Sequence, residues 1–110
     1  MSTKTELNAL VLATNAGTSE GAVTAIKSQF LGAEVVSCES LEAAVACLAE
    51  SRQPFSVVCL GTREFLATAG DGRSYLRILR EALEARGWLG KTEFYFFSTF
   101  KRELHAVEGH

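Results

Sequence analysis

Short apolar runs alternate with stretches of helical periodicity along the chain. Apolar runs bounded by turn residues predict four strands, at residues 9–13, 33–39, 55–61 and 92–99. Between the strands, apolar residues recur at helical spacing and predict helices after Ser19, after Ser40 and over residues 73–87. Residues 62–72 show neither pattern and are expected to form a loop. Arg63 and Glu64 in this loop are expected to be solvated, and the alternative is that they pair with a partner.

This β-α-β-α-β-α-β order predicts one α/β domain over residues 1–110, a three-layer, doubly wound parallel sheet of the flavodoxin-like type. Right-handed crossovers favour the strand order 2-1-3-4. In such sheets ligands bind where the winding reverses, at the carboxyl ends of strands one and three. That place corresponds here to residues 13–18 and 61–64. Residues 100–110 are expected to form a polar C-terminal helix or a tail.

Composition and charge argue against several classes of protein. The chain has 110 residues, 47% of them hydrophobic, and a single proline, which favours a packed domain over a disordered one. The formal net charge is −2, and no basic run or interleaved aromatic stripe indicates a nucleic-acid partner. No apolar run approaches the roughly 20 residues of a membrane span. The first ten residues are polar and lack the apolar segment of a signal peptide.

The three cysteines, Cys38, Cys47 and Cys59, lie in or beside apolar segments at irregular spacing. An odd number without a CxxC pair favours reduced, buried thiols in a cytoplasmic protein over a disulfide framework. Because His105 and His110 are far along the chain from the cysteines, no metal site is expected. No nucleophile–base pair or carboxylate cluster converges on the switch point, so we expect neither catalysis nor a cofactor.

Several segments resemble the receiver domains of two-component response regulators. "GAEVVSCESLEAAVACLAESRQPFSVVCL" is similar to the family's second strand, Ala-rich second helix and third strand. "DGRSYLRILREA" is similar to its Asp-Gly followed by a Leu-rich helix, and "EFYFFST" to its fourth strand, which ends in Ser or Thr. The likeness extends from about Leu10 to Thr99. It implies a flavodoxin-like fold and a role in signalling or transcription regulation.

The resemblance also implies what the chain does not do. The family transfers a phosphoryl group to an aspartate at the end of strand three, with a divalent cation held by clustered carboxylates. The acceptor position falls on Gly61 and the acidic pair falls within residues 13–15, Ala-Thr-Asn, none of which is a carboxylate. Only Ser98 or Thr99 matches a member of the catalytic set. The resemblance therefore implies a degenerate pseudo-receiver without aspartyl phosphorylation, lacking the family's fifth strand and helix.

Strand four carries successive large side chains, "FYFF", which need cover on both faces. Without a fifth strand it becomes an edge of the sheet and a template for association. The side chains expected to bind a partner are Phe94, Tyr95, Phe96, Phe97 and Phe100. We expect a protein partner on this edge, most simply a second copy of the chain in a homodimer. The alternative is that residues 100–107 fold back as a helix and shield the strand.

The loop "NAGTSEG" is a weaker candidate site. It leads from strand one into a helix N-terminus, where free amides favour anions. Its candidate anion-binding residues are Asn15, Gly17, Thr18 and Ser19, but it matches neither GxxxxGK[ST] nor GxGxxG. As an ordinary turn, it would use Thr18 or Ser19 as the helix cap. The loop is also similar to that of the sugar-phosphotransferase IIB components, whose reactive cysteine is missing here.

Two functions stay open at this point. The first is a non-catalytic, receiver-like interaction module. The second is a small-molecule or phosphate-binding module of flavodoxin-like architecture that uses residues 15–19 and 61–63.

Overall fold

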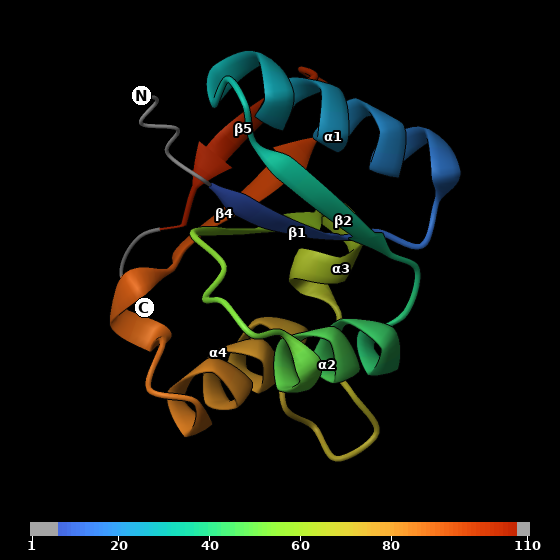
Figure 1. Ribbon diagram of the computed structural model, residues 1–110. Helices are drawn as coiled ribbons and strands as arrows, with labels where there is room; N and C mark the ends of the chain where they lie inside the picture. Colours follow the sequence, from blue (N-terminus) through green and yellow to red (C-terminus); the bar gives the residue numbers. More distant parts are fainter. Residues whose placement is uncertain (1–6, 108–110) are drawn as a thin grey trace, which may run out of the picture.

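The computed structural model describes residues 7–107, which form a five-stranded sheet with helices packed against it (Figure 1). The strands are β1 (Asn8–Leu12), β2 (Glu34–Cys38), β3 (Val57–Gly61), β4 (Glu93–Ser98) and β5 (Glu103–Ala106). The helices are α1 (Ala16–Gln29), α2 (Leu41–Glu50), α3 (Thr62–Leu66) and α4 (Tyr75–Ala85), with a short 3-10 helix, η1 (Leu89–Lys91). The α/β class predicted from the sequence is confirmed.

The sheet has the strand order β2-β1-β3-β4-β5 and is mostly parallel. β1 pairs in parallel with β2 and β3, and β3 pairs in parallel with β4, so the carboxyl ends of these strands meet at one end of the sheet. β5 runs antiparallel to β4, with His105 opposite Phe96 and Leu104 opposite Phe97. The predicted order 2-1-3-4 is confirmed within a larger sheet. The prediction of a wholly parallel sheet is wrong.

β4 is an inner strand and not the edge that the sequence predicted. The chain turns back after Ser98, whose carbonyl oxygen accepts a hydrogen bond from the amide of Arg102 at 2.6 Å. Residues 100–107 therefore contribute a strand where a polar helix or tail was expected, and residues 108–110 of that prediction lie outside the described residues. An antiparallel neighbour is reached through a tight turn, which is how so short a segment satisfies the backbone of β4.

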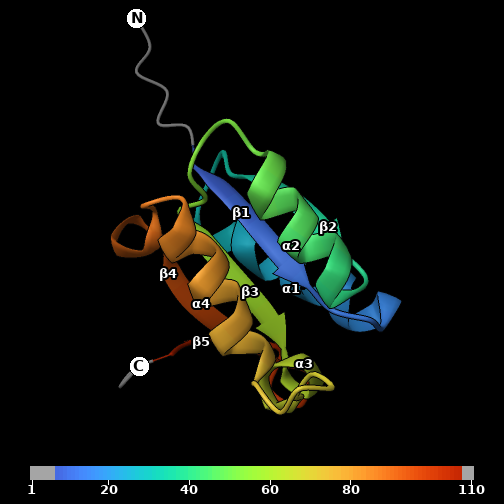
Figure 2. The ribbon, with the colours of Figure 1, turned by 90° about the horizontal axis from the view of Figure 1, so that it is seen from below.

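Both faces of the sheet are covered. α1 lies on one face, and α2 and α4 lie on the other (Figures 1 and 2). The cluster between the sheet and α1 includes Ala9, Val11, Ile26, Cys59 and Phe97. The cluster beneath α2 and α4 includes Leu10, Leu12, Val58, Leu60, Leu79 and Leu83. Because alternate residues of β1 and β3 face opposite clusters, both strands are apolar throughout, which explains the continuous apolar runs in the sequence.

Two of the β4 aromatics predicted to bind a partner belong to the core. Phe94 and Phe97 are each 2% exposed and lie in the two opposite clusters. Phe97 packs so closely on α1 that a Cβ atom built on Gly21 would lie 2.9 Å from its ring. The prediction that β4 presents these side chains to a partner is wrong, because the two faces of an inner strand are already buried.

The other two aromatics of β4 are half-buried and engaged within the domain. Tyr95 meets the ring of Phe30 edge-on, with centroids 5.9 Å apart. Phe96 stacks on Phe65 of α3 at 4.7 Å and on His105 of β5 at 5.0 Å. Among the predicted partner-binding residues, only the side chain of Phe100 is fully presented to solvent, at 93% exposure in the turn between β4 and β5.

Candidate binding site at the carboxyl end of the sheet

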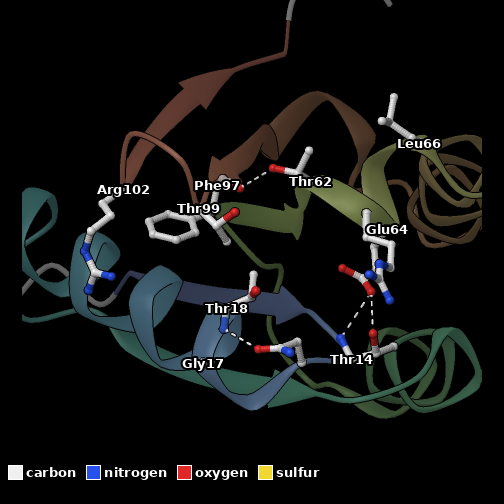
Figure 3. Close-up of a pocket in the computed structure, with 11 residues that line it drawn as sticks. Thr14, Gly17, Thr18, Thr62, Glu64, Leu66, Phe97, Thr99 and Arg102 are labelled. Carbon is white, nitrogen blue, oxygen red and sulfur yellow. Dashed lines mark hydrogen bonds between the residues drawn. The ribbon is translucent and has the colours of Figure 1, made fainter.

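A cavity of about 660 Å³ lies at the carboxyl ends of β1, β3 and β4 (Figure 3). It is lined by Thr14, Asn15, Gly17, Thr18, Thr62, Arg63, Glu64, Leu66, Phe97, Thr99 and Arg102. The sequence predicted a site here from residues 13–18 and 61–64, and the structure brings these two segments to one cavity. Its volume is within the roughly 300–1,000 Å³ typical of small-molecule sites.

The loop between β1 and α1 forms one wall. The side chain of Asn15 accepts a hydrogen bond from the amide of Thr18 at 3.1 Å and caps α1. Asn15 is therefore the cap, in place of the predicted Thr18 or Ser19. The hydroxyl of Ser19 instead bonds to that of Ser37 at 3.2 Å. Of the four anion-loop candidates, Asn15, Gly17 and Thr18 line this cavity, and Ser19 lies outside its lining.

Gly61, the degenerate phosphoacceptor position, is buried at the end of β3. A Cβ atom built on it would lie 2.5 Å from Oε1 of Glu64 and 3.0 Å from Cγ2 of Thr18. A larger residue at position 61 would therefore have to displace the carboxylate of Glu64. The space beside this strand end is occupied by a carboxylate from the following helix.

Glu64 lies in a segment expected at the site, but the sequence analysis missed its burial and its contact with Thr14. It was expected to be solvated in a loop, but residues 62–66 form α3, and Glu64 is only 4% exposed. Its Oε2 accepts hydrogen bonds from the amide of Thr14 at 3.2 Å and from the hydroxyl of Thr14 at 2.7 Å. These donors compensate for the burial of the charge. The one signal in the sequence that could have indicated this burial was the spacing of Glu64, three residues after the glycine that ends β3.

α3 connects the carboxyl ends of three strands. The carboxylate of Glu64 accepts a hydrogen bond from the hydroxyl of Thr14 in the loop after β1. The hydroxyl of Thr62 donates to the carbonyl oxygen of Phe97 in β4 at 2.8 Å. α3 itself follows β3 without an intervening loop. The floor of the cavity is therefore fixed by side-chain hydrogen bonds from one short helix.

Two arginines give the cavity its positive charge. Arg63 lies in α3, and Arg102 lies in the β4–β5 turn. Within residues 7–107, neither guanidinium has an ion-pair partner in the protein. Arg73, by contrast, is paired with Asp71 and Glu81. The two cavity arginines are therefore free to meet an anion.

Two threonine hydroxyls in the lining are also unengaged. No group in the described part of the chain hydrogen-bonds to the hydroxyl of Thr18 or Thr99. Figure 3 shows Arg102 at one end of the lining and Glu64 at the other, with Thr18 and Thr99 between them. The site thus has Arg102 at one end, the α3 residues Arg63 and Glu64 at the other, and hydroxyls between them.

The lining does not form a metal centre. Among the residues that the structure describes, no three His, Cys, Asp or Glu side chains are grouped so that they could hold a metal ion. Glu64 is the one acidic side chain in the lining. A single carboxylate does not supply the clustered oxygen ligands that receiver chemistry requires.

The cysteines lie outside this cavity, and all three are free. Burial raises the pKa of Cys59 to about 12. Burial, together with the neighbouring Cys47, raises the pKa of Cys38 to about 11, and burial also raises the pKa of Cys47. The thiols are protonated at neutral pH, so none is activated as a nucleophile.

Comparison of the chain with protein-family models, curated proteins and solved structures finds no match. Within residues 7–107, none of the helices combines the length and the apolar character of a membrane span.

Proposed function

We propose that this domain is a non-catalytic binding module of three-layer, doubly wound architecture, and that the cavity at the carboxyl end of its sheet takes a small anionic molecule. One observation carries the proposal: Arg63 and Arg102, both without an ion-pair partner in the described protein, line one cavity with the unengaged hydroxyls of Thr18 and Thr99. Guanidinium groups suit phosphate and carboxylate oxygens, which they bind through paired N–H donors. The cavity also lies where ligands bind in sheets of this type.

The proposed role excludes phosphoryl transfer at the receiver position. Gly61 has no side-chain oxygen to accept a phosphoryl group. Glu64, the nearest carboxylate, is engaged with Thr14. The module therefore acts by binding, and the three free cysteines support a cytoplasmic setting for it.

A second candidate is a receiver-like protein-interaction module in signalling, without phosphorylation. It is favoured by two exposed apolar side chains: Phe100 in the β4–β5 turn is 93% exposed, and Leu66 in the cavity lining is 73% exposed. A partner, which includes a second copy of the chain, would bury both. The β4 edge does not enter this candidate, because β5 covers it.

Thermal melts in phosphate, pyrophosphate and matched concentrations of chloride test the first candidate. Binding to the folded state alone raises the melting temperature, and a ligand at 100 times its Kd adds about 2.7 kcal/mol. We expect a saturable rise with phosphate or pyrophosphate that is lost in the Arg63→Gln/Arg102→Gln double variant. Lys27→Gln, which removes a charge at the far end of α1, is the matched control and should keep the rise.

The outcomes separate the two candidates. An equal shift in the double variant and the control, or no shift at all, would overturn the anion-binding proposal. A concentration-dependent dimer in sedimentation, abolished by Phe100→Ser, would favour the interaction module instead.

A further inference from the structure

We infer that the ligand is a small polyol carrying one anionic group, which binds with the anionic group at Arg102 and with its hydroxyls donating to Glu64. The inference rests on the proposed function and adds the chemical class of the ligand and its direction in the cavity.

Arg102 at one end of the lining and the free carboxylate oxygen of Glu64 at the other set this direction. Arg102 and Glu64 are separated by Thr18 and Thr99 in the view of Figure 3. An anion with charge at both ends would place one of its charges against the carboxylate of Glu64. A ligand that is anionic at one end and a neutral hydrogen-bond donor at the other satisfies both ends.

The carboxylate of Glu64 keeps one oxygen for such a donor. Thr14 supplies two hydrogen bonds, and both go to Oε2. Within residues 7–107, Oε1 accepts no hydrogen bond from the protein, and Figure 3 shows this oxygen turned away from Thr14, on the cavity side. Hydroxyl groups bind ionised carboxylates through short, charge-assisted hydrogen bonds. Glu64 therefore discriminates between a hydroxylated ligand and an alkyl one.

Arg102 occupies a backbone position that would suit glycine. Its φ is 56°, and it is the one non-glycine residue with positive φ among those described. L side chains rarely adopt this region, and glycine is usual at the left-handed position of a hairpin turn. The arginine thus incurs a conformational cost, and its guanidinium lines the cavity. Backbone strain of this kind is typical of residues held for binding.

The two hydroxyls between these ends complete the site. Thr18 comes from the first turn of α1, and Thr99 comes from the turn after β4. A threonine hydroxyl both donates and accepts, so each can bond to a ligand hydroxyl or to an anionic oxygen. A polyol with adjacent hydroxyl groups can form hydrogen bonds with both Thr18 and Thr99, whereas a ligand with one polar end cannot.

Calorimetric titration of the full chain with two probes tests the inference. Glycerol 3-phosphate and n-propyl phosphate share the phosphate and the chain length, and only the first has hydroxyls. We expect glycerol 3-phosphate to bind at least about ten-fold more tightly, a difference of about 1.4 kcal/mol. Glu64→Gln should reduce that ratio by several-fold with little change for n-propyl phosphate. Arg102→Gln should weaken both probes to a similar degree, and Lys27→Gln should leave both unchanged.

The results distinguish failure of the inference from failure of the proposed function. Binding of neither probe would overturn the inference together with the proposed function. Equal affinity for the two probes in the unaltered protein would overturn the inference and leave the anion site standing. The same holds if Glu64→Gln lowers both affinities equally.

Two further measurements keep the test independent of a single variant. If Glu64→Gln does not fold, Thr99→Val replaces it, and it should also lower the preference for glycerol 3-phosphate. Glycerate, in place of glycerol 3-phosphate, separates a carboxylate from a phosphate as the anionic group. Tighter binding of glycerate than of propionate would support the inference. The inference would be overturned if neither glycerate nor glycerol 3-phosphate bound more tightly than its alkyl counterpart.

Discussion

One carboxylate oxygen of Glu64 accepts hydrogen bonds from both the amide and the hydroxyl of Thr14. Glu64 and Thr14 lie 50 positions apart in the chain. The contact ties α3 to the loop after β1 and satisfies a buried charge. Hydrogen bonds to charged groups contribute about 1.5–3 kcal/mol each, and an orphaned buried donor is costly. We therefore predict that Glu64→Ala lowers the free energy of unfolding by about 2 kcal/mol, measured by urea denaturation.

Glu84→Ala is the matched control, because Glu84 is exposed on α4. Surface substitutions of this kind change stability by less than about 0.5 kcal/mol. A double-mutant cycle with Thr14→Val should give a coupling energy of about 1 kcal/mol for the hydroxyl. Equal losses for Glu64→Ala and Glu84→Ala would contradict the assignment.

The contact between Gly21 and Phe97 predicts that a glycine-to-alanine substitution inside a helix lowers stability, where it normally raises it. Alanine is normally better than glycine inside a helix, by roughly 0.8–1 kcal/mol. At Gly21, however, the added Cβ would lie 2.9 Å from the ring of Phe97, which is buried in the core cluster beneath α1. Overpacking costs about 1–3 kcal/mol, so Gly21→Ala should destabilise the domain. The Gly21→Ala/Phe97→Leu double variant should recover part of the loss, and a more stable Gly21→Ala would refute the close approach.

Arg102 offers a test in which stability and binding change in opposite directions. Its φ of 56° suits glycine, so Arg102→Gly relieves backbone strain of about 1 kcal/mol. We predict a small rise in the melting temperature without ligand, together with the loss of the rise produced by phosphate. Arg102→Gln, which keeps the strained backbone, should lose the phosphate effect without gaining stability. Parallel behaviour of the two variants would argue against strain at this turn.

The buried thiols predict a loss of stability at high pH. Burial raises the pKa of Cys59 from 9.0 to about 12 in the folded protein. Above pH 9 the unfolded chain loses this proton while the folded chain keeps it, so the free energy of unfolding falls by about 1.4 kcal/mol per pH unit, up to the folded pKa. Below pH 9 the thiol adds no pH dependence.

Urea unfolding between pH 8 and pH 11 checks this, with Cys59→Ala as the comparison. Other titrating groups are shared by the two proteins, so the difference between their slopes isolates one thiol. Parallel curves above pH 9 would show that Cys59 does not keep its proton in the folded state.

The elements that the sequence predicted are those fixed by strong local signals. The apolar runs of β1 and β3 are long because both faces of these strands are buried, and Ser40 caps α2 as expected, accepting from the amide of Ala43. Gly87, at a φ of 73°, ends α4 in the conformation that glycine allows. The position of the cavity followed from the order of these elements, since parallel strands present their carboxyl ends together.

The elements that the sequence missed depend on contacts between distant residues. β5 has four residues, and its burial pattern is mixed, with Leu104 facing α1 and Glu103 exposed, so no apolar run marks it. α3 is five residues long and has no side-chain cap. Glu64 looks like any solvated loop charge until the fold brings Thr14 to it. Contacts with residues distant in the chain, and not local periodicity, determine the formation of β5 and α3 and the burial of Glu64.

The direction of β5 decides which of its ends lies beside the cavity. A parallel fifth strand would place its final residue beside the cavity, whereas the antiparallel strand places its starting turn there. The turn at residues 99–102 therefore joins β4 to β5 and also supplies Thr99 and Arg102 to the cavity lining. Surface turns tolerate insertion and substitution far better than paired strands do. Changes in this one turn would thus alter the cavity lining while every strand keeps its register.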